Sequence, residues 1–118
     1  NSVREMYPNE QILVVFQPHL FSRTRDFVDD FATALTKFDE VLLLDIYPAR
    51  EIPIAGVDSN WLLGKIENTH KKLTQNKNLV KDIKNSSAKV VVMLGAGDIG
   101  VLINRVTKEL LITLTNEI

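Results

Sequence analysis

Short apolar runs alternate along the chain with segments of mixed polarity. Residues 12–16 and 41–44 are continuous apolar runs built largely from branched side chains, which is the pattern of strands buried on both faces of a parallel sheet. Residues 88–94 have a similar character and form the clearest strand pattern in the chain. Pro18 cannot donate a ladder hydrogen bond, so the first strand is predicted to end by Gln17.

An amphipathic helix is predicted between the first two strands. Ser22 has a side chain suited to the N-cap of this helix. Apolar residues recur after it at helical spacing, namely Phe27, Phe31, Leu35 and Phe38, with Val28 and Ala32 beside them. A strand, a helix and a second strand within about 35 residues predict a right-handed βαβ unit.

A long ordered loop is predicted over residues 46–58, which proline and glycine interrupt. It follows the second strand, and ligands bind at the carboxyl ends of the strands in open α/β sheets. Its candidate contact residues are Tyr47, Arg50 and Glu51. The alternative for Arg50 and Glu51 is that they are solvated or paired surface charges, which the sequence by itself favours.

The second half of the chain predicts further helices and strands. Asp58 or Ser59 can cap a short helix that carries Trp61 and Leu62 on its apolar face. A short strand near residues 70–73 and a helix through Leu79, Val80 and Ile83 are expected next. The tail, residues 111–118, fits either a longer helix or an edge strand.

These elements predict an α/β protein of a single domain, residues 1–118. The expected architecture is a Rossmann-like, mostly parallel sheet flanked by helices in three α/β/α layers. A chain of 118 residues is long enough for one hydrophobic core.

Composition excludes several functional classes. The formal net charge of −1 gives no electrostatic reason to expect nucleic acid or an anionic membrane as a partner. The chain has no cysteine, so a disulfide framework and thiolate metal sites are excluded, and no metal site is expected. No apolar run reaches the roughly 18 residues of a membrane span, and the expected compartment is the cytoplasm.

The candidate chemistry lies where the first strand gives way to a helix. Arg23 and Arg25 fall in the predicted first turn, where the helix dipole disfavours cations by about 0.3 to 1 kcal/mol each. A negative partner is therefore expected nearby. It is either local, through the pairs Arg23–Asp26 and Arg25–Asp29, or an external carboxylate or phosphate. His19 is either a third donor or a structural residue.

A glycine-rich turn follows the strand pattern at residues 88–94. Residues 95–100, Gly-Ala-Gly-Asp-Ile-Gly, match G-x-G-x-x-G between a strand and a predicted helix. A dinucleotide fingerprint normally lies on the first strand and needs another strand after its helix, whereas the chain ends soon after Gly100. These glycines are expected instead to let the backbone approach an anion or a neighbouring domain.

Three blocks of this sequence resemble motifs of the Mur ligase family. Residues 16–26, Phe-Gln-Pro-His-Leu-Phe-Ser-Arg-Thr-Arg-Asp, resemble the Q-P-H-x-[FY]-[ST]-R-T motif of the members that join L-alanine to UDP-N-acetylmuramate. Residues 45–51 with 53–56, and residues 95–100, agree in order and character. Together the blocks span most of the chain, from about Tyr7 to Ile103.

The resemblance implies that residues 1–118 are most of the C-terminal, amino-acid-docking domain, without the N-terminal UDP-sugar domain and the central ATP domain. It implies a reaction in which ATP, with Mg²⁺, phosphorylates the lactyl carboxylate of UDP-N-acetylmuramate. The L-alanine amine then attacks the acyl phosphate, in a step of peptidoglycan synthesis. The C-terminal domain would close over ATP held mainly by the central domain.

By the motif match, His19 and Arg23 are the residues implied to bind L-alanine, with Arg23 on its carboxylate. No catalytic residue is expected in the chain itself. Further contacts with the substrate or with the closing ATP domain are possible at Arg25, Tyr47, Arg50, Gly95, Ala96 and Gly97.

One departure from the family motif affects the implied site. Many family members have arginine at the position of Leu20, so the carboxylate of alanine lacks one expected cation; Arg25 or Arg50 could replace it. The chain contains no G-x-x-x-x-G-K-[ST] motif, so ATP turnover by this chain alone is not expected. The alternatives are a free-standing anion- or nucleotide-binding α/β module and a related ligase that recycles murein peptides.

Overall fold

A parallel β-sheet forms the centre of the molecule. The computed structural model describes residues 9–95 and 113–116. The strands are β1 (Ile12–Gln17), β2 (Glu40–Leu43), β3 (Lys71–Leu73), β4 (Val90–Gly95) and β5 (Thr113–Asn116). They form one five-stranded sheet in the order β3-β2-β1-β4-β5, and every neighbouring pair is parallel. The βαβ prediction for the first two strands is confirmed.

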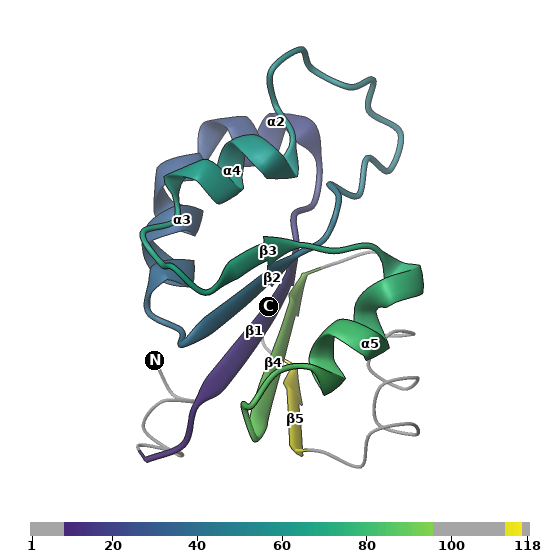
Figure 1. Cartoon of the computed structure of the whole chain (residues 1–118). Coiled ribbons are helices and arrows are strands. Elements are labelled where there is room, and N and C mark those ends of the chain that lie inside the picture. Colours follow the sequence, from purple (N-terminus) through teal and green to yellow (C-terminus); the bar gives the residue numbers. More distant parts are fainter. Residues whose placement is uncertain (1–8, 96–112, 117–118) are drawn as a thin grey trace.

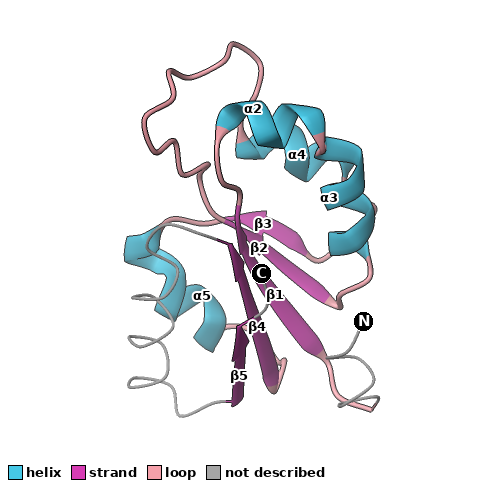
Figure 2. Cartoon of the chain, turned by 180° about the vertical axis from the view of Figure 1, so that it is seen from behind, coloured by secondary structure: helices cyan, strands magenta, loops and turns pink. Residues whose placement is uncertain are grey.

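Helices cover both faces of this sheet (Figures 1 and 2). One face carries α2 (Phe21–Asp26), α3 (Val28–Thr36) and α4 (Ser59–Lys65), and the other carries α5 (Leu79–Lys84), preceded by a 3-10 turn at Asn76–Asn78. The predicted three-layer α/β/α fold is therefore confirmed. The tail, for which the sequence left two structures open, contains the edge strand β5.

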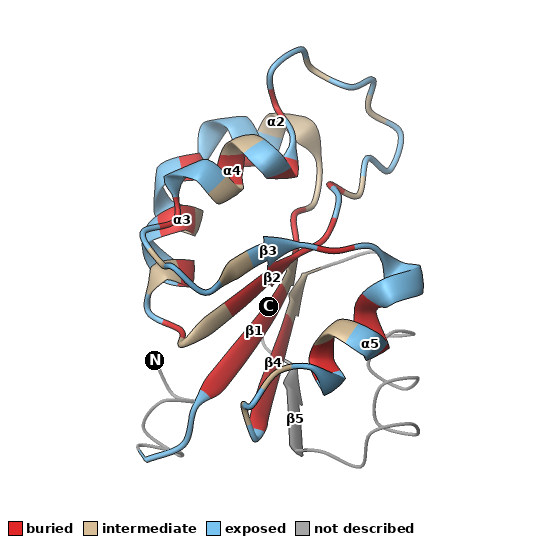
Figure 3. Ribbon diagram, viewed as in Figure 1, coloured by how far each residue is buried: buried red, intermediate tan, exposed pale blue. Residues whose placement is uncertain are grey.

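The hydrophobic core lies on both sides of the central strands (Figure 3). Alternate residues of a strand point to opposite faces. Ile12 and Val14 accordingly join the cluster under α3 and α4, while Leu13 and Val15 join the cluster under α5. All four are fully buried, which explains why this strand has no polar position before Gln17.

The predicted helix between β1 and β2 is divided in two, and this corrects the sequence prediction. Phe27 leaves the helical conformation at φ −118°, ψ 19°, and its ring is 50% exposed. The buried positions of α3 are Val28, Ala32 and Leu35. Leu35 and Phe38 are also buried and Phe31 packs against the core, so the predicted apolar face is confirmed except at Phe27.

The predicted N-cap at Ser22 is also wrong. The first helix begins earlier, at Phe21, with Leu20 in the cap position, and no side chain of the cap residue bonds to the helix. Leu20 has a φ of 69°, a conformation that is unusual for a residue other than glycine. The backbone therefore turns sharply between β1 and α2.

The later elements agree with the sequence predictions. The Asp58 carboxylate accepts a hydrogen bond from the Trp61 backbone N–H at 2.8 Å and caps α4. The ammonium of Lys71 donates to the Leu63 and Ile66 carbonyls at 3.0 and 2.7 Å. It thus satisfies carbonyls at the carboxyl end of α4, where the helix dipole favours a cation.

The carboxyl ends of β1 and β4 are adjacent, with Gln17 opposite Gly95. The chain passes from β1 to its neighbour β2 on one side, and β4 and β5 extend the sheet on the other. This reversal is the topological switch point at which α/β sheets bind ligands. The helix predicted to follow the glycine-rich turn, like residues 96–100, lies outside the described residues.

Gly95 is predicted to be intolerant of a side chain. Its φ is 142°, and an added Cβ would lie 2.6 Å from the Gln17 carbonyl oxygen. Gly95→Ala should lower the free energy of unfolding by about 2 to 4 kcal/mol through backbone strain and overpacking, measured by chemical denaturation.

Gly64→Ala is the matched control for this substitution. Nothing lies within 4 Å of a Cβ added at Gly64, which lies within α4, so alanine there should stabilise the protein by up to about 1 kcal/mol. Equal effects of the two substitutions would contradict the close approach of β1 and β4.

Candidate ligand site at the carboxyl edge of the sheet

The turn that carries His19 is fixed by backbone hydrogen bonds to the loop that follows β2. The Tyr47 N–H donates to the Pro18 carbonyl, and the Leu20 N–H donates to the Tyr47 carbonyl, both at 2.8 Å. The Leu20 carbonyl accepts from the Thr24 N–H at 3.1 Å and from the Thr24 hydroxyl at 2.8 Å. The turn at residues 18–20 is therefore held at both of its ends.

His19 and Tyr47 form one aromatic pair within this arrangement. They are joined as an isolated parallel bridge, and their rings stack at 5.8 Å between centroids with an interplanar angle of 25°. Both side chains are half-buried. Two residues predicted independently as candidate contacts are thus brought into one place by tertiary structure.

Glu51 provides the negative charge expected at the start of the helix. The Ser22 backbone N–H donates to Glu51 Oε1 at 3.0 Å, and the Ser22 hydroxyl donates to Glu51 Oε2 at 2.5 Å. These hydrogen bonds from Ser22 hold the pKa of Glu51 below its ordinary value. A carboxylate of the protein itself, from the loop after β2, therefore occupies the position where the sequence suggested an external anion.

The predicted partners of the two arginines are wrong. Arg25 Nε donates to the adjacent Asp26 at 2.9 Å, and Asp29 instead faces Lys65 at 3.6 Å. Arg25 lies in the last turn of α2, which ends at Asp26, and the helix dipole favours a cation there. Arg23 is the third of the six residues of α2 and lies in its first turn as well, where Glu51 supplies a negative charge at the adjacent Ser22.

Arg23 is an exposed cation. Its guanidinium makes no hydrogen bond or ion pair with the part of the chain that the structure describes. It follows directly after Ser22, which Glu51 holds, so its backbone is firmly placed although its charged group is available. Arg50 is likewise exposed, in the turn closed by the hydrogen bond from the Glu51 N–H to the Pro48 carbonyl at 2.9 Å.

Gln17 adds a buried amide at the same edge. Its side chain is 6% exposed, and its Oε1 atom has no hydrogen-bond partner among the described residues. Gly95 lies directly against its backbone. Ala96 and Gly97, also predicted contacts, lie outside the described residues.

A shallow pocket of about 390 Å³ is lined by Gln17 and Tyr47, but not by His19, Arg23, Arg50 or Gly95. It is bounded by the ends of β1 and β2, by Tyr47 and Pro48, and by residues 75–77 after β3. Its position agrees with the expectation that the long loop at 46–58 borders a ligand site. The loop contains no helix or strand in the structure, as predicted.

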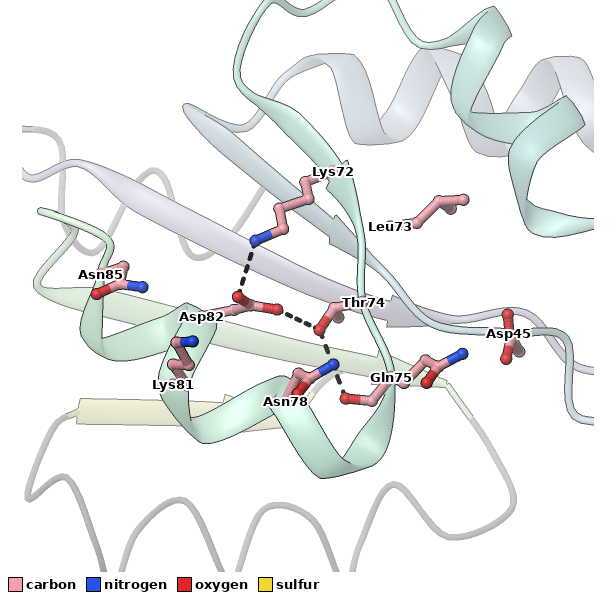
Figure 4. Close-up of a pocket in the computed structure, with 9 residues that line it drawn as sticks. All are labelled: Asp45, Lys72, Leu73, Thr74, Gln75, Asn78, Lys81, Asp82 and Asn85. Atoms are coloured by element: carbon pink, nitrogen blue, oxygen red, sulfur yellow. Dashed lines mark hydrogen bonds and ion pairs between the residues drawn. The ribbon is translucent and has the colours of Figure 1, made fainter.

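A second pocket of about 550 Å³ lies between β3 and α5. Figure 4 shows that Lys72 and Thr74 both point at the carboxylate of Asp82. Burial alone would raise the pKa of Asp82, but the hydrogen bonds from Thr74 and Lys72 outweigh it and the pKa is lowered. This carboxylate already has its partners, so the pocket is best explained as a structural junction.

The described residues offer no preformed metal site. No three histidine, cysteine, aspartate or glutamate side chains among them are grouped closely enough to hold a metal ion. Within that same part of the chain, no helix has the length and apolarity needed to cross a membrane.

Known relatives match almost the whole sequence. Over 110 residues, or 93% of the chain, it is 64% identical to a UDP-N-acetylmuramate–L-alanine ligase of Christiangramia forsetii. It is 60% identical over 109 residues to the ligase of that name from Flavobacterium psychrophilum, and 53% identical over 109 residues to that of Flavobacterium johnsoniae. The chain resembles the UDP-N-acetylmuramate–L-alanine ligases. No family model matches it.

The chain spans only a part of these ligases. The matched residues cover 93% or 92% of this chain but 24% of each of the three relatives. The resemblance inferred from three motif blocks is therefore confirmed. Residues outside this segment contribute most of the length of each relative.

Two features of the candidate site were not recognised from the sequence. Glu51 was considered as a surface charge or a ligand contact, whereas the structure uses it to hold Ser22. Gln17 was considered only as the end of a strand. The available signal was its position, because Gln17 is a polar residue at the carboxyl end of an otherwise apolar strand, where a buried amide is unusual.

Glu51 should make the stability of the protein depend on pH. Its pKa is lower in the folded than in the unfolded state, where the ordinary value is 4.5. Its carboxylate therefore contributes stability above about pH 4.5, and this contribution is lost as the pH falls through the folded-state pKa. The difference in unfolding free energy between wild type and Glu51→Gln should shrink from pH 7 towards pH 3.

Urea denaturation at a series of pH values measures this difference. Ser22→Ala removes one of the hydrogen bonds to Glu51. In the otherwise wild-type protein it should reduce the pH-dependent part of the unfolding free energy. A difference that stays constant across the series would contradict the interaction.

Proposed function

We propose that this chain is the C-terminal, amino-acid-docking domain of a cytoplasmic ligase that joins L-alanine to UDP-N-acetylmuramate. The high identity to ligases of that name supports the proposal. The observation that carries it is the exposed, unpaired guanidinium of Arg23 on a firmly held backbone, among the described residues, at the ligand-binding edge of the sheet. A free cation in a fixed place suits recognition of a carboxylate.

The proposed reaction begins with transfer of a phosphoryl group from ATP to the lactyl carboxylate of UDP-N-acetylmuramate. The alanine amine then attacks the resulting acyl phosphate, and phosphate leaves. ATP, Mg²⁺ and the nucleotide sugar would be held mainly by the N-terminal and central domains of the full-length ligase. The absence of a P-loop from the sequence fits this division.

The task assigned to this chain is to bind and orient the amino acid. In the proposal, Arg23 pairs with the alanine carboxylate while His19, stacked on Tyr47, donates a hydrogen bond from the turn that precedes α2. Domain closure would bring these donors towards the acyl phosphate, where negative charge develops on phosphoryl and tetrahedral oxygens. The orientation of the alanine amine would then increase the rate of its attack on the acyl phosphate, because the two reacting groups are already held close together.

Further contacts are proposed on the segments around this pair. Arg50 could supply the second cation that Leu20 does not, because it lies on the turn next to Tyr47. Arg25 is a weaker candidate since Asp26 already binds its Nε atom. The glycine-rich turn with Gly95, Ala96 and Gly97 would allow the backbone to approach a substrate or the ATP domain.

Arg23→Ala should raise the alanine concentration that the full-length ligase requires. A charge-assisted hydrogen bond is worth about 1.5 to 3 kcal/mol, so the KM for alanine should increase roughly 10- to 100-fold while that for ATP stays constant. Phosphate release as a function of alanine concentration measures the effect.

Lys37→Ala provides the control for loss of an exposed cation, at the end of α3, and should leave both KM values unchanged. An unchanged alanine KM in Arg23→Ala would exclude Arg23 as the carboxylate ligand.

The isolated 118-residue chain should not hydrolyse ATP. It lacks a phosphate-binding P-loop, and the proposal assigns ATP and Mg²⁺ to other domains. Phosphate release by the purified chain, with ATP, Mg²⁺ and alanine, should equal the rate without protein. Turnover that survives extensive purification and is lost on Arg23→Ala would refute this assignment.

A further inference from the structure

Hydrogen bonds join the segments 18–22 and 47–51 at both ends of the second segment. Two backbone hydrogen bonds of 2.8 Å join Tyr47 to Pro18 and Leu20. Four residues further along, Glu51 binds both the backbone N–H and the hydroxyl of Ser22. The first pair of bonds holds one end of the 47–51 turn, and Glu51 holds the other.

The two anchors differ in what they require from the sequence. The bonds at Tyr47 use backbone atoms and are available to nearly any residue. The bonds at Glu51 need a side chain of the right length with two acceptor oxygens. Of the described hydrogen bonds, these are the ones that join the interior of the 46–58 loop to α2.

The proposed substrate-binding groups lie on both sides of this contact. Arg23 follows Ser22 directly, and Arg50 precedes Glu51 directly. Arg50 also lies within the turn that the Glu51 N–H closes onto Pro48. Release of Glu51 from Ser22 would leave the turn attached at Tyr47 alone, and Arg50 would move relative to Arg23.

We propose that Glu51 is a positioning residue for amino-acid binding, which fastens the 47–51 turn to Ser22 and so sets the separation of Arg50 from Arg23. This inference rests on the proposed function. Glu51 does not bind the carboxylate of the amino acid in this arrangement, because one ionised carboxylate repels another. Both of its oxygens accept hydrogen bonds from Ser22 instead.

Loss of the contact between Glu51 and Ser22 should lower the affinity for the amino acid. A displacement of about 1 Å in a group that orients a substrate can reduce activity about 100-fold, and supporting hydrogen bonds keep binding groups within about 0.5 Å of their productive position. Glutamine at position 51 keeps the shape and one acceptor oxygen, but its NH₂ group can only donate to the Ser22 hydroxyl. Two charge-assisted hydrogen bonds are then replaced by neutral ones about half as strong, so the contact with Ser22 is weakened.

The test is a double-mutant cycle in the full-length ligase with Glu51→Gln, Ser22→Ala and the double variant. The KM values for alanine, ATP and UDP-N-acetylmuramate and the kcat are measured for each, with the thermal midpoint as a check on folding. Glu67→Gln is the matched control, since Glu67 is an exposed glutamate that follows α4.

Glu51→Gln should raise the alanine KM about 10-fold and leave the other two KM values within about twofold. Ser22→Ala keeps the backbone donor, so its increase should be smaller, and the double variant should resemble Glu51→Gln because both changes break the same contact. Glu51→Asp keeps two acceptor oxygens on a shorter side chain and should recover part of the affinity. Glu67→Gln should behave like wild type.

Three outcomes would overturn the inference. One is an unchanged alanine KM in Glu51→Gln. Another is an equal rise in all three KM values together with a lower thermal midpoint, which would indicate a purely structural role. The third is strict additivity of the two single variants, which would mean that Glu51 and Ser22 act separately.

These outcomes are separable from failure of the proposed function. If the wild-type enzyme releases phosphate in response to alanine and Arg23→Ala raises the alanine KM, the proposed function stands, and an inert Glu51→Gln overturns the positioning role alone. If the wild-type enzyme shows no alanine-dependent release, the proposed function fails first.

Discussion

The central strand β1 is the constraint on which the rest of the structure depends. It pairs on one side with β2 and on the other with β4, and helices cover both of its faces, so its first four residues are fully buried. Pro18 then removes the backbone donor that would continue the ladder. The polar and charged residues of the 16–26 motif follow immediately and gather at the carboxyl edge of the sheet.

The second constraint is that hydrogen bonds must hold the backbone of the sharp turn after β1 in its unusual conformation. Leu20 holds a φ of 69°, which persists only where the surroundings determine it. The Tyr47 backbone and the buried Thr24 hydroxyl supply that restraint. The loop after β2 is thus both a support for the turn and a wall of the nearby pocket, which gives a physical reason for its length.

Several charged side chains near this edge already have hydrogen-bond or ion-pair partners within the protein. Glu51 is satisfied by Ser22, Arg25 by Asp26, and Asp82 by Lys72 and Thr74. Arg23 is left as an exposed cation without a described partner. Arg23 and Arg50, both exposed, can therefore serve for recognition, because a ligand there competes with water and not with a neighbouring side chain.

Hydrophobic pattern by itself determined the strands as far as β4, the βαβ unit and the three-layer fold, because burial of continuous apolar runs on both faces has few solutions. The structure chose Asp58 over Ser59 as the cap of α4 and a strand over a helix in the tail. The motif residues also determined the resemblance to the ligases. Only the tertiary structure decided that Val28 and not Phe27 faces the sheet, since either residue fits helical spacing. It alone decided that Glu51 meets Ser22 and that His19 stacks on Tyr47, because these contacts join residues about 30 positions apart through the order of strands, which no local pattern encodes.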